Sequence, residues 1–192
     1  SMAAKAAALA GLKVVMLEKR QEIGDPVRCA EGVSKRALCR MMKPEQEWIS
    51  SEVKGARIYA PDGKSIIMSE DKSGGEVGYV LERKIFDRGL AMQAAQAGAK
   101  VLVKTRALGL RKKDGAICGV SALRIGEPLQ IDAPLVIGAD GVESKVGRWA
   151  GIDTTLKLQD IESCAQFLVH DASIDEEYTE FFLGNSIAPS GY

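Results

Sequence analysis

Small apolar residues recur through the first ten positions of the chain, and a short run of larger ones follows. Alanine dominates residues 2–10, which predicts a helix of high propensity that Gly11 ends. Residues 14–17 are continuously apolar, which is typical of a buried strand. A helix that leads directly into a buried strand is the unit of a parallel sheet, so this pattern predicts an α/β fold.

A second helix-to-strand unit is predicted in the middle of the chain. Apolar residues at helical spacing indicate a helix over 84–97, Gly98 suits its end, and 100–105 has the pattern of the next strand. Residues 79–81, just before this helix, are also strand-like. The pattern therefore indicates a second crossover connection within the sheet.

The stretch between these two units carries different signals. Residues 34–42 have the pattern of a short helix that starts at Ser34. Residues 57–59 and 65–68 alternate around the turn residues 61–63, which predicts a β-hairpin. The hairpin indicates that an antiparallel sheet is inserted into the α/β domain.

The second half of the chain begins with a predicted antiparallel ribbon. Three alternating segments form it, at 107–110, 117–123 and 129–131. Residues 135–137 then have the pattern of a buried parallel strand, with 138–141 as its exit loop and a short helix at 142–149. Residues 178–183 are strand-like and are expected to begin a further sheet.

Composition narrows the classes of function. The chain is 46% hydrophobic and 27% charged, the balance of a globular protein that buries a core. Lys plus Arg and Asp plus Glu both number 26, so the zero net charge argues against nucleic acid as a partner. No apolar run approaches the roughly 18 residues that a membrane span needs.

Compartment and chain ends can also be inferred. The absence of a signal sequence predicts a cytoplasmic protein whose four cysteines are free thiols. Because the cysteines lack paired spacing and His170 is the single histidine, we expect no metal site. The sequence opens inside a predicted helix and closes without a terminal element, so we expect a fragment of a longer enzyme.

Two acidic residues lie where open α/β sheets bind ligands. Glu18 follows the strand 14–17, close to the spacing at which a dinucleotide-binding fold places an acid on a ribose hydroxyl, if a glycine-rich turn precedes Ser1. Asp140, in Gly-Ala-Asp-Gly, is placed to accept from a ribose or ribityl hydroxyl. A surface glutamate and an ordinary Asp-Gly turn remain the structural alternatives for these two positions.

Five blocks of the sequence together resemble one family of flavoproteins. They begin at Glu18, Pro26, Gly78, Gly138 and Ala188 and read Glu-Lys-Arg, Pro-Val-Arg-Cys-Ala-Glu-Gly-Val-Ser, Gly-Tyr-Val-Leu-Glu-Arg-Lys-Ile-Phe-Asp, Gly-Ala-Asp-Gly-Val-Glu-Ser-Lys-Val-Gly-Arg-Trp-Ala-Gly and Ala-Pro-Ser-Gly-Tyr. This order is similar to that of the archaeal geranylgeranyl reductases, in the para-hydroxybenzoate hydroxylase superfamily. The resemblance covers the whole chain.

The resemblance implies an FAD-binding Rossmann-like domain of the GR2 type with an inserted antiparallel substrate sheet, both incomplete. Its implied parts are 1–50 and 79–152 for the FAD-binding domain, 51–78 for the start of the insertion and 153–192 for the start of the substrate-binding sheet. The implied reaction is saturation of geranylgeranyl double bonds on an archaeal glycerophospholipid by reduced FAD. Ferredoxin or NAD(P)H would supply the electrons, and peripheral contact with the membrane is expected.

The resemblance also implies roles for single residues. The expected cofactor-binding residues are Glu18, Arg28, Cys29, Ala30, Arg83, Ala107, Asp140 and Gly141. Cys29 and Glu31 are the expected catalytic residues: Cys29 as a proton donor or as a thiol that tunes the flavin, and Glu31, on the chemistry of the reaction, as the alternative acid. Tyr192 is expected to contact the substrate. The chain departs from the family pattern at Ala30 and Ser190, where the family has glycine.

The functional hypothesis requires four of these residues to converge on one bound flavin: Glu18, Cys29, Arg83 and Asp140. A flavin-dependent monooxygenase of the same superfamily is one alternative, and a noncatalytic domain that keeps the fold is another. Since free cysteines usually serve as small packed hydrophobes, ordinary packing is the alternative for Cys29.

Overall fold

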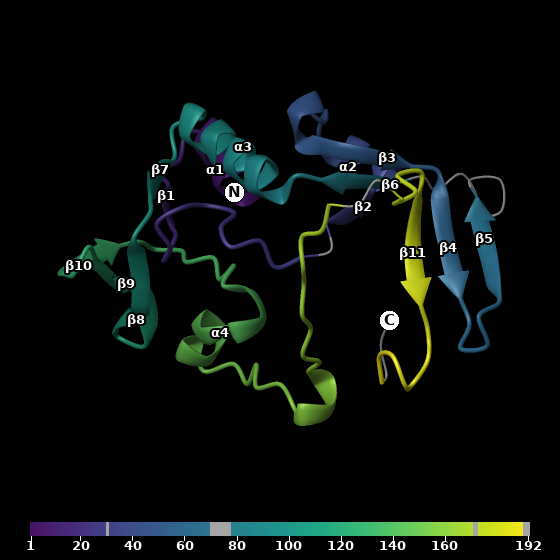
Figure 1. Cartoon of the computed structure of the whole chain (residues 1–192). Coiled ribbons are helices and arrows are strands. Elements are labelled where there is room, and N and C mark those ends of the chain that lie inside the picture. Colours follow the sequence, from purple (N-terminus) through teal and green to yellow (C-terminus); the bar gives the residue numbers. More distant parts are fainter. Residues whose placement is uncertain (30, 70–77, 171–172, 190–192) are drawn as a thin grey trace. The chain divides into compact units, whose positions relative to one another are not determined.

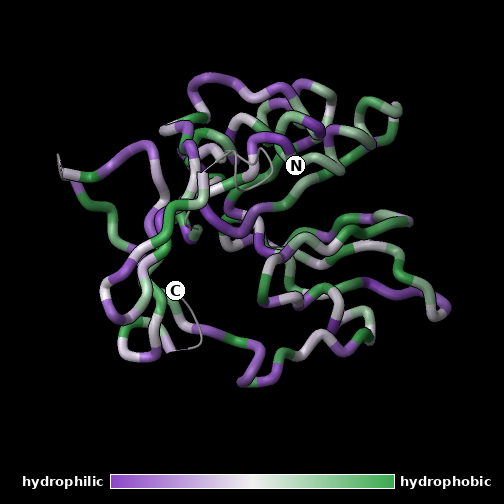
Figure 2. Tube along the Cα trace, turned by 90° about the vertical axis from the view of Figure 1, so that its right-hand side faces the viewer, coloured by the Kyte–Doolittle hydropathy of each residue, from purple (hydrophilic) through white to green (hydrophobic). Residues whose placement is uncertain are grey.

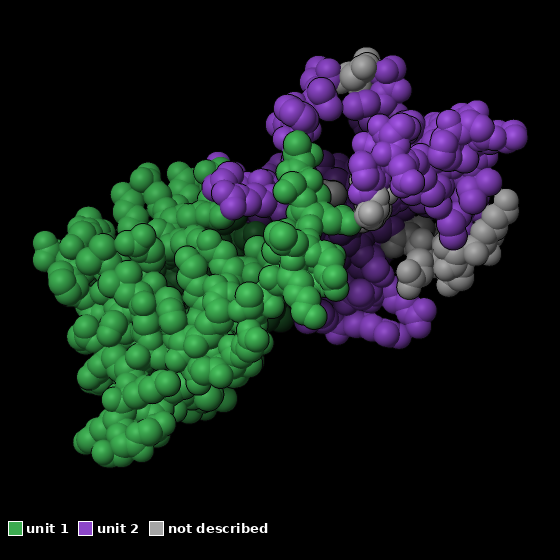
Figure 3. Space-filling view, turned by 90° about the horizontal axis from the view of Figure 1, so that it is seen from below, with its two compact units in different colours: residues 1–25, 87–165 green, residues 26–86, 166–192 purple. Residues whose placement is uncertain are grey.

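The structure is a computed structural model that describes residues 1–29, 31–69, 78–170 and 173–189. The chain divides into two compact units, coloured separately in Figure 3. Unit 1 comprises Ser1–Asp25 and Asp87–Ala165, and unit 2 comprises Pro26–Phe86 and Gln166–Tyr192. Figure 1 labels the helices and strands. Each unit is therefore assembled from segments distant in sequence.

Unit 1 contains the predicted helix-to-strand units. Helices α1 (Met2–Leu9) and α3 (Arg83–Gln96) precede strands β1 (Val15–Leu17) and β7 (Lys100–Leu102) in the predicted order. The first turn of α3, up to Phe86, belongs to unit 2. Strand β7 ends before residue 105, where the sequence predicted its end. The strands pair in parallel, with Val15 opposite Lys100. Small residues form the core between these elements, so the helix backbones can lie close to the strands. Its buried members are Ala8, Ala94 and Ala99.

The antiparallel ribbon in unit 1 is confirmed. Strands β8 (Thr105–Lys113), β9 (Ala116–Arg124) and β10 (Glu127–Asp132) form a sheet in the order β10-β9-β8. The strands are longer than the alternating segments because each continues to the next turn. Gly119 on β9 has no room for a side chain: an added Cβ would lie 2.1 Å from the backbone oxygen of Ile131.

The predicted strand at 135–137 was wrong. These residues have no regular structure, and Leu135 and Ile137 are 75% and 63% exposed. An apolar run becomes a strand only where another strand offers its unpaired backbone, and within the described residues none pairs with this one. The run therefore enters the Asp140 loop as an extended connection.

The helix expected at 142–149 is split. A 3-10 helix, η2 (Gly141–Glu143), precedes α4 (Lys145–Ala150). Ser144 separates them in the left-handed conformation, with φ of +40°. A left-handed residue interrupts the helical hydrogen-bond series, so α4 starts three residues later than predicted.

Unit 2 holds a three-stranded antiparallel sheet covered by a short helix. Its strands are β2 (Gly32–Ser34), β6 (Gly78–Leu81) and β3 (Ile49–Val53), in that order. Helix α2 (Lys35–Met41) begins at Ser34, whose hydroxyl accepts the Ala37 N–H as a helix cap. Leu38 on the helix packs against Tyr79 and Leu81 on β6.

Trp48 extends the packed region of unit 2. It ends a 3-10 helix, η1 (Gln46–Trp48), and its side chain is fully buried. Its ring meets Phe86 edge to face, with centroids 5.3 Å apart. Phe86 also packs against the Leu38 cluster, so the start of α3 is fixed against the sheet.

The second sheet of unit 2 is mixed, not wholly antiparallel as expected. The predicted hairpin is confirmed as β4 (Gly55–Tyr59) and β5 (Ser65–Ser69), paired antiparallel. Strand β11 (Tyr178–Phe182) then adds parallel to the other edge of β4. The strand at the end of the chain therefore joins the hairpin.

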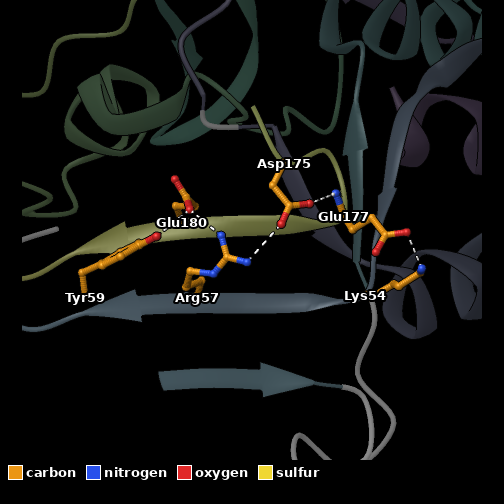
Figure 4. A network of polar contacts seen from close by, with 6 residues as sticks. All are labelled: Lys54, Arg57, Tyr59, Asp175, Glu177 and Glu180. Carbon is orange, nitrogen blue, oxygen red and sulfur yellow. Dashed lines mark hydrogen bonds and ion pairs between the residues drawn. The ribbon is translucent and has the colours of Figure 1, made fainter. Parts of the chain in front are cut away.

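A network centred on Arg57 holds β11 to β4 (Figure 4). Its guanidinium donates to Glu180 at 2.9 Å and to Asp175 at 3.0 Å. The Tyr59 hydroxyl donates to the same Glu180 carboxylate at 2.8 Å. The hydrogen bond to Glu180, followed by those with Tyr59 and Asp175, raises the pKa of Arg57 above its ordinary value.

Further contacts fix the register of these two strands. Lys54 pairs with Glu177 at one end of the two strands (Figure 4). The rings of Tyr59 and Phe182 stack at the other end, with centroids 4.5 Å apart. A parallel pair has no hairpin turn to set its register, so these side-chain pairs supply that information.

Figure 2 shows the hydrophobic residues as green stretches of the trace. Several large hydrophobic residues are exposed, outside the packed regions. The segment that leads to β11 has no regular structure over 161–170, and Phe167, Leu168 and Val169 in it are 83%, 102% and 71% exposed. Among the described helices, none has the length and apolar character needed to cross a bilayer.

Candidate functional site

Glu18 lies at the carboxyl end of β1, where the sequence placed it. The backbone N–H of Glu18 donates to the backbone oxygen of Leu102 at 2.9 Å, and the backbone oxygen of Glu18 accepts from the Thr105 N–H at 2.8 Å. Its carboxylate accepts from the backbone N–H of Arg20 at 2.7 Å. The half-buried side chain is therefore held at the sheet edge where open α/β folds bind ligands.

Asp140 organises the loop that precedes α4. Its Oδ2 accepts from the backbone N–H of Val146 at 2.9 Å. Burial acts to raise the pKa of Asp140, but the Val146 N–H and neighbouring backbone donors outweigh it and hold the pKa below its ordinary value. One carboxylate oxygen is therefore used within the protein.

Two glycines bring backbone close to this loop. An added Cβ at Gly138 would lie 3.0 Å from the Val146 side chain, so only glycine lets the strand-like connection approach α4 this closely. Gly141 has φ of +70° and open space on its Cα. A ligand can therefore approach the backbone at Gly141.

An ion pair joins the Glu18 loop to the Asp140 loop. Lys19 Nζ lies 3.0 Å from Glu143 Oε2, and the hydrogen bond from Lys19 lowers the pKa of Glu143. Lys19 directly follows Glu18, and Glu143 lies in η2 directly after Asp140. The structure therefore brings the two predicted carboxylates onto adjacent loops of unit 1.

Ala107 lies on β8 in the same unit. It is two residues beyond Thr105, whose N–H binds the Glu18 backbone, and β8 also contacts α4. Ala107 opposes Ala122 on β9, just before a bulge in the ribbon. The start of β8 thus lies beside the Glu18 loop.

The Cys29 loop belongs to unit 2 and is held by hydrogen bonds with Gln166 and Glu31. The Gln166 side chain makes two hydrogen bonds with the Cys29 backbone, at 3.2 Å to its N–H and 2.7 Å to its oxygen. The Cys29 Sγ accepts from the backbone N–H of Glu31 at 3.3 Å. The Cys29 side chain is partly buried.

Glu31 connects this loop to the sheet and to α3. It adopts φ of +65°, and its backbone oxygen accepts from Leu81 N–H at 2.9 Å. Its carboxylate lies 3.5 Å from the backbone N–H of Arg83, the first residue of α3. The guanidinium of Arg83 lies 5.9 Å from the Phe86 ring centre, and Arg28 is exposed on the loop.

The predicted site residues thus form two groups. The first, in unit 1, comprises Glu18, Ala107, Asp140 and Gly141, and the second, in unit 2, comprises Arg28, Cys29, Glu31 and Arg83. Ala30, Ser190 and Tyr192 lie outside the described residues. The convergence of Glu18, Cys29, Arg83 and Asp140 on one flavin stays a prediction.

Sequence reasoning missed three residues that position these groups. Lys19 and Glu143 fell within the quoted blocks, but nothing in their spacing indicated that they pair. Gln166 lies in a stretch without periodicity, so the sequence offered no signal for its contact with Cys29.

Comparison with known proteins gives these positions a context. The chain is 71% identical over all its 192 residues to the digeranylgeranylglycerophospholipid reductase of Methanothrix thermoacetophila, covering 49% of that protein. It is 60% identical over its full length to the digeranylgeranylglycerophospholipid reductase of Methanosarcina acetivorans, covering 47% of that protein. The chain is thus similar over its whole length to proteins named digeranylgeranylglycerophospholipid reductase. It spans about half the length of the curated relatives it matches.

A family comparison and a solved structure agree with this relationship. Residues 160–192 match the geranylgeranyl reductase catalytic domain. The crystal structure of a geranylgeranyl bacteriochlorophyll reductase-like protein from Thermoplasma acidophilum is 44% identical, with a TM-score of 0.82 over 95% of this chain and 47% of that one.

More distant structures share the fold. The FAD-dependent halogenase CndH superposes with a TM-score of 0.60 over 77% of this chain and 36% of its own, at 16% identity. Aklavinone-11 hydroxylase, solved with FAD and aklavinone, superposes with a TM-score of 0.56 over 74% of this chain and 31% of its own, at 19% identity. About three quarters of this chain therefore shares the mixed α/β fold of these two enzymes.

Proposed function

We propose that the whole protein is an FAD-dependent reductase that saturates geranylgeranyl double bonds of an archaeal glycerophospholipid. The observation that carries the proposal is the 71% identity, over every residue of the chain, with a digeranylgeranylglycerophospholipid reductase. The halogenase and the hydroxylase share its fold at under a quarter identity, which supports the FAD-binding architecture alone.

The residues of unit 1 suit the nucleotide part of FAD. Glu18 offers a carboxylate to a ribose hydroxyl from the end of a parallel strand. Asp140 keeps a lowered pKa, so it is ionised at neutral pH and accepts from hydroxyl groups. Gly141 leaves its backbone open to a phosphate or ribityl chain. Ala107 lies beside these loops and contributes backbone.

The residues of unit 2 suit the reactive part. We assign Arg28 and Arg83 to the flavin because a cation stabilises the anionic reduced ring. Arg28 directly precedes Cys29, and the backbone N–H of Arg83 lies 3.5 Å from the Glu31 carboxylate. The same assignment extends to Ala30 and Tyr192, outside the described residues, as contacts with cofactor and substrate.

Saturation of one double bond adds a hydride to one carbon and a proton to the other. Reduced FAD, when bound, supplies the hydride. The Cys29 thiol gives its proton to the second carbon and is reprotonated from solvent, and Glu31 is the alternative donor two residues away. Orienting the alkene between hydride and proton donors removes much of the barrier.

Electrons reach the flavin from ferredoxin or NAD(P)H, and the lipid arrives from a membrane that the protein contacts peripherally. The exposed Phe167, Leu168 and Val169 lie in the segment matching the catalytic domain family, which is consistent with an apolar substrate.

Mass spectrometry tests the proposal directly. The complete enzyme is incubated anaerobically with FAD, dithionite and a digeranylgeranyl glycerophospholipid. We expect the lipid to gain two hydrogen atoms for each double bond. If turnover in air instead inserts an oxygen atom from O₂ into the product, the protein is a monooxygenase. If the complete protein binds no FAD, it is a noncatalytic domain that keeps the fold.

A further inference from the structure

A side-chain amide holds the backbone of the Cys29 loop from a distant part of the sequence. Gln166 lies 137 residues beyond Cys29, yet its Oε1 accepts from the Cys29 N–H at 3.2 Å and its Nε2 donates to the Cys29 oxygen at 2.7 Å. Both residues belong to unit 2. The two bonds form a reciprocal pair on one residue.

Such a pair fixes backbone conformation. In an extended residue the N–H and the C=O point to the same side, as they do where a strand meets its neighbour. The planar primary amide of glutamine carries an acceptor and a donor at matching separation, so it replaces a neighbouring strand at a single residue. Gln166 therefore restricts both backbone dihedrals of Cys29.

A second set of bonds fixes the thiol itself. The Glu31 N–H donates to Cys29 Sγ at 3.3 Å, and Glu31 turns the chain sharply with φ of +65°. The Glu31 oxygen accepts from the N–H of Leu81, a residue only 2% exposed on β6. Gln166 thus holds the Cys29 backbone, while the thiol is bound by Glu31, a residue that is itself bound to the buried sheet.

We propose that Gln166 is a positioning residue that orients the Cys29 thiol for proton delivery. The inference rests on the proposed function and extends it to a residue outside the predicted site. Gln166 lies in the segment that matches the geranylgeranyl reductase catalytic domain, whereas Cys29 lies 131 residues before that segment begins at residue 160. The contact therefore couples that segment to the Cys29 loop.

The test uses the complete FAD-loaded enzyme and the variant Gln166→Ala. We expect kcat to fall about tenfold while KM stays within about twofold, because misorienting a donor affects the reaction more than binding. In a Cys29→Ala background, Gln166→Ala should change kcat by no more than about twofold, since a residue that acts through the thiol has nothing left to orient.

A second readout does not depend on catalysis. Iodoacetamide labelling of Cys29, followed by peptide mapping, should be about fivefold faster in Gln166→Ala because the loop opens more often. Gln166→Glu, which keeps the size but loses the donor, should also speed labelling and covers the case in which the alanine variant misfolds. Gln159→Ala is the control, because Gln159 is also an exposed glutamine and lies seven residues before Gln166. In this variant the rate of Cys29 labelling and kcat should match those of the wild type.

The outcomes separate this inference from the proposed function. An enzyme that saturates no lipid refutes the proposed function, and the labelling rates still decide whether Gln166 orients Cys29. Wild-type labelling rates in both Gln166 variants overturn the inference. An equal loss of kcat with and without the Cys29 thiol also overturns it, because that result assigns Gln166 a purely structural role.

Discussion

Lys19 and Glu143 form an ion pair at 3.0 Å that connects the residue after Glu18 to the 3-10 helix after Asp140. The two partners lie 124 residues apart in sequence. This contact makes the two cofactor carboxylates proposed in unit 1 neighbours. It is also exposed, with 49% and 47% of the two side chains accessible, so solvent and salt weaken it.

Breaking this pair should weaken FAD binding slightly. An exposed ion pair contributes about 0–1 kcal/mol, so Glu143→Gln in the complete enzyme should raise the Kd for FAD by no more than about fivefold. High salt should reduce the difference. The exchange Lys19→Glu with Glu143→Lys should restore the wild-type Kd in a fluorescence titration. A Kd that the exchange fails to restore would contradict a purely electrostatic role.

Removing the charge of Glu18 should weaken FAD binding more strongly. A hydrogen bond to a charged group contributes about 1.5–3 kcal/mol, so Glu18→Gln should raise the Kd for FAD by about tenfold or more. The glutamine oxygen can still accept from the Arg20 N–H, which keeps the loop in place. Glu127→Gln, at the exposed start of β10, is the matched control and should bind FAD normally. Equal Kd values for FAD in the two variants would show that Glu18 does not bind the cofactor.

The stabilisation from Asp140 should depend on pH. Its pKa is lowered in the folded protein, so its contribution is complete above the unfolded value of about 3.9 and is lost as pH falls through the folded value. Asp140→Asn keeps an acceptor for the Val146 N–H but cannot ionise. The wild type should therefore have the higher melting temperature at pH 7, with the difference shrinking below about pH 4. A difference that does not change with pH would refute this assignment.

Replacing Gly55 should destabilise the mixed sheet of unit 2. An added Cβ there would lie 2.1 Å from the Met68 backbone oxygen, so β4 and β5 would have to separate. We expect Gly55→Ala to cost about 1–3 kcal/mol in a urea titration. Gly109→Ala is the control, since its Cβ meets nothing within 4 Å and its φ is not in the left-handed region. Equal midpoints for both variants would show that the sheet adjusts freely.

The sequence predicted the elements whose signals are local. The helices at α1 and α3 and the hairpin of β4 and β5 follow from periodicity and turn residues within each segment. The strand expected at 135–137 failed because hydrophobicity indicates burial in a sheet but cannot supply the neighbouring strand. The parallel pairing of β11 with β4 was also out of reach, since Arg57 and Glu180 are 123 residues apart.

In the candidate site, too, the sequence predicted residues with local signals but not the contacts between distant segments. Glu18 and Asp140 were predicted because each follows an apolar run at the spacing of known ligand sites, and the resemblance supplied Cys29 and Arg83. The contacts that position these residues were not predicted. Lys19 with Glu143, and Gln166 with Cys29, depend on how distant segments meet, which no local pattern records.

An anaerobic single turnover tests the central claim most directly. The complete enzyme is loaded with FAD, reduced with one equivalent of dithionite, and mixed with digeranylgeranyl glycerophospholipid. We expect the absorbance of oxidised flavin to return as the lipid gains two hydrogen atoms, with one double bond saturated for each flavin. A flavin that stays reduced in the presence of unchanged lipid would contradict alkene reduction by this protein.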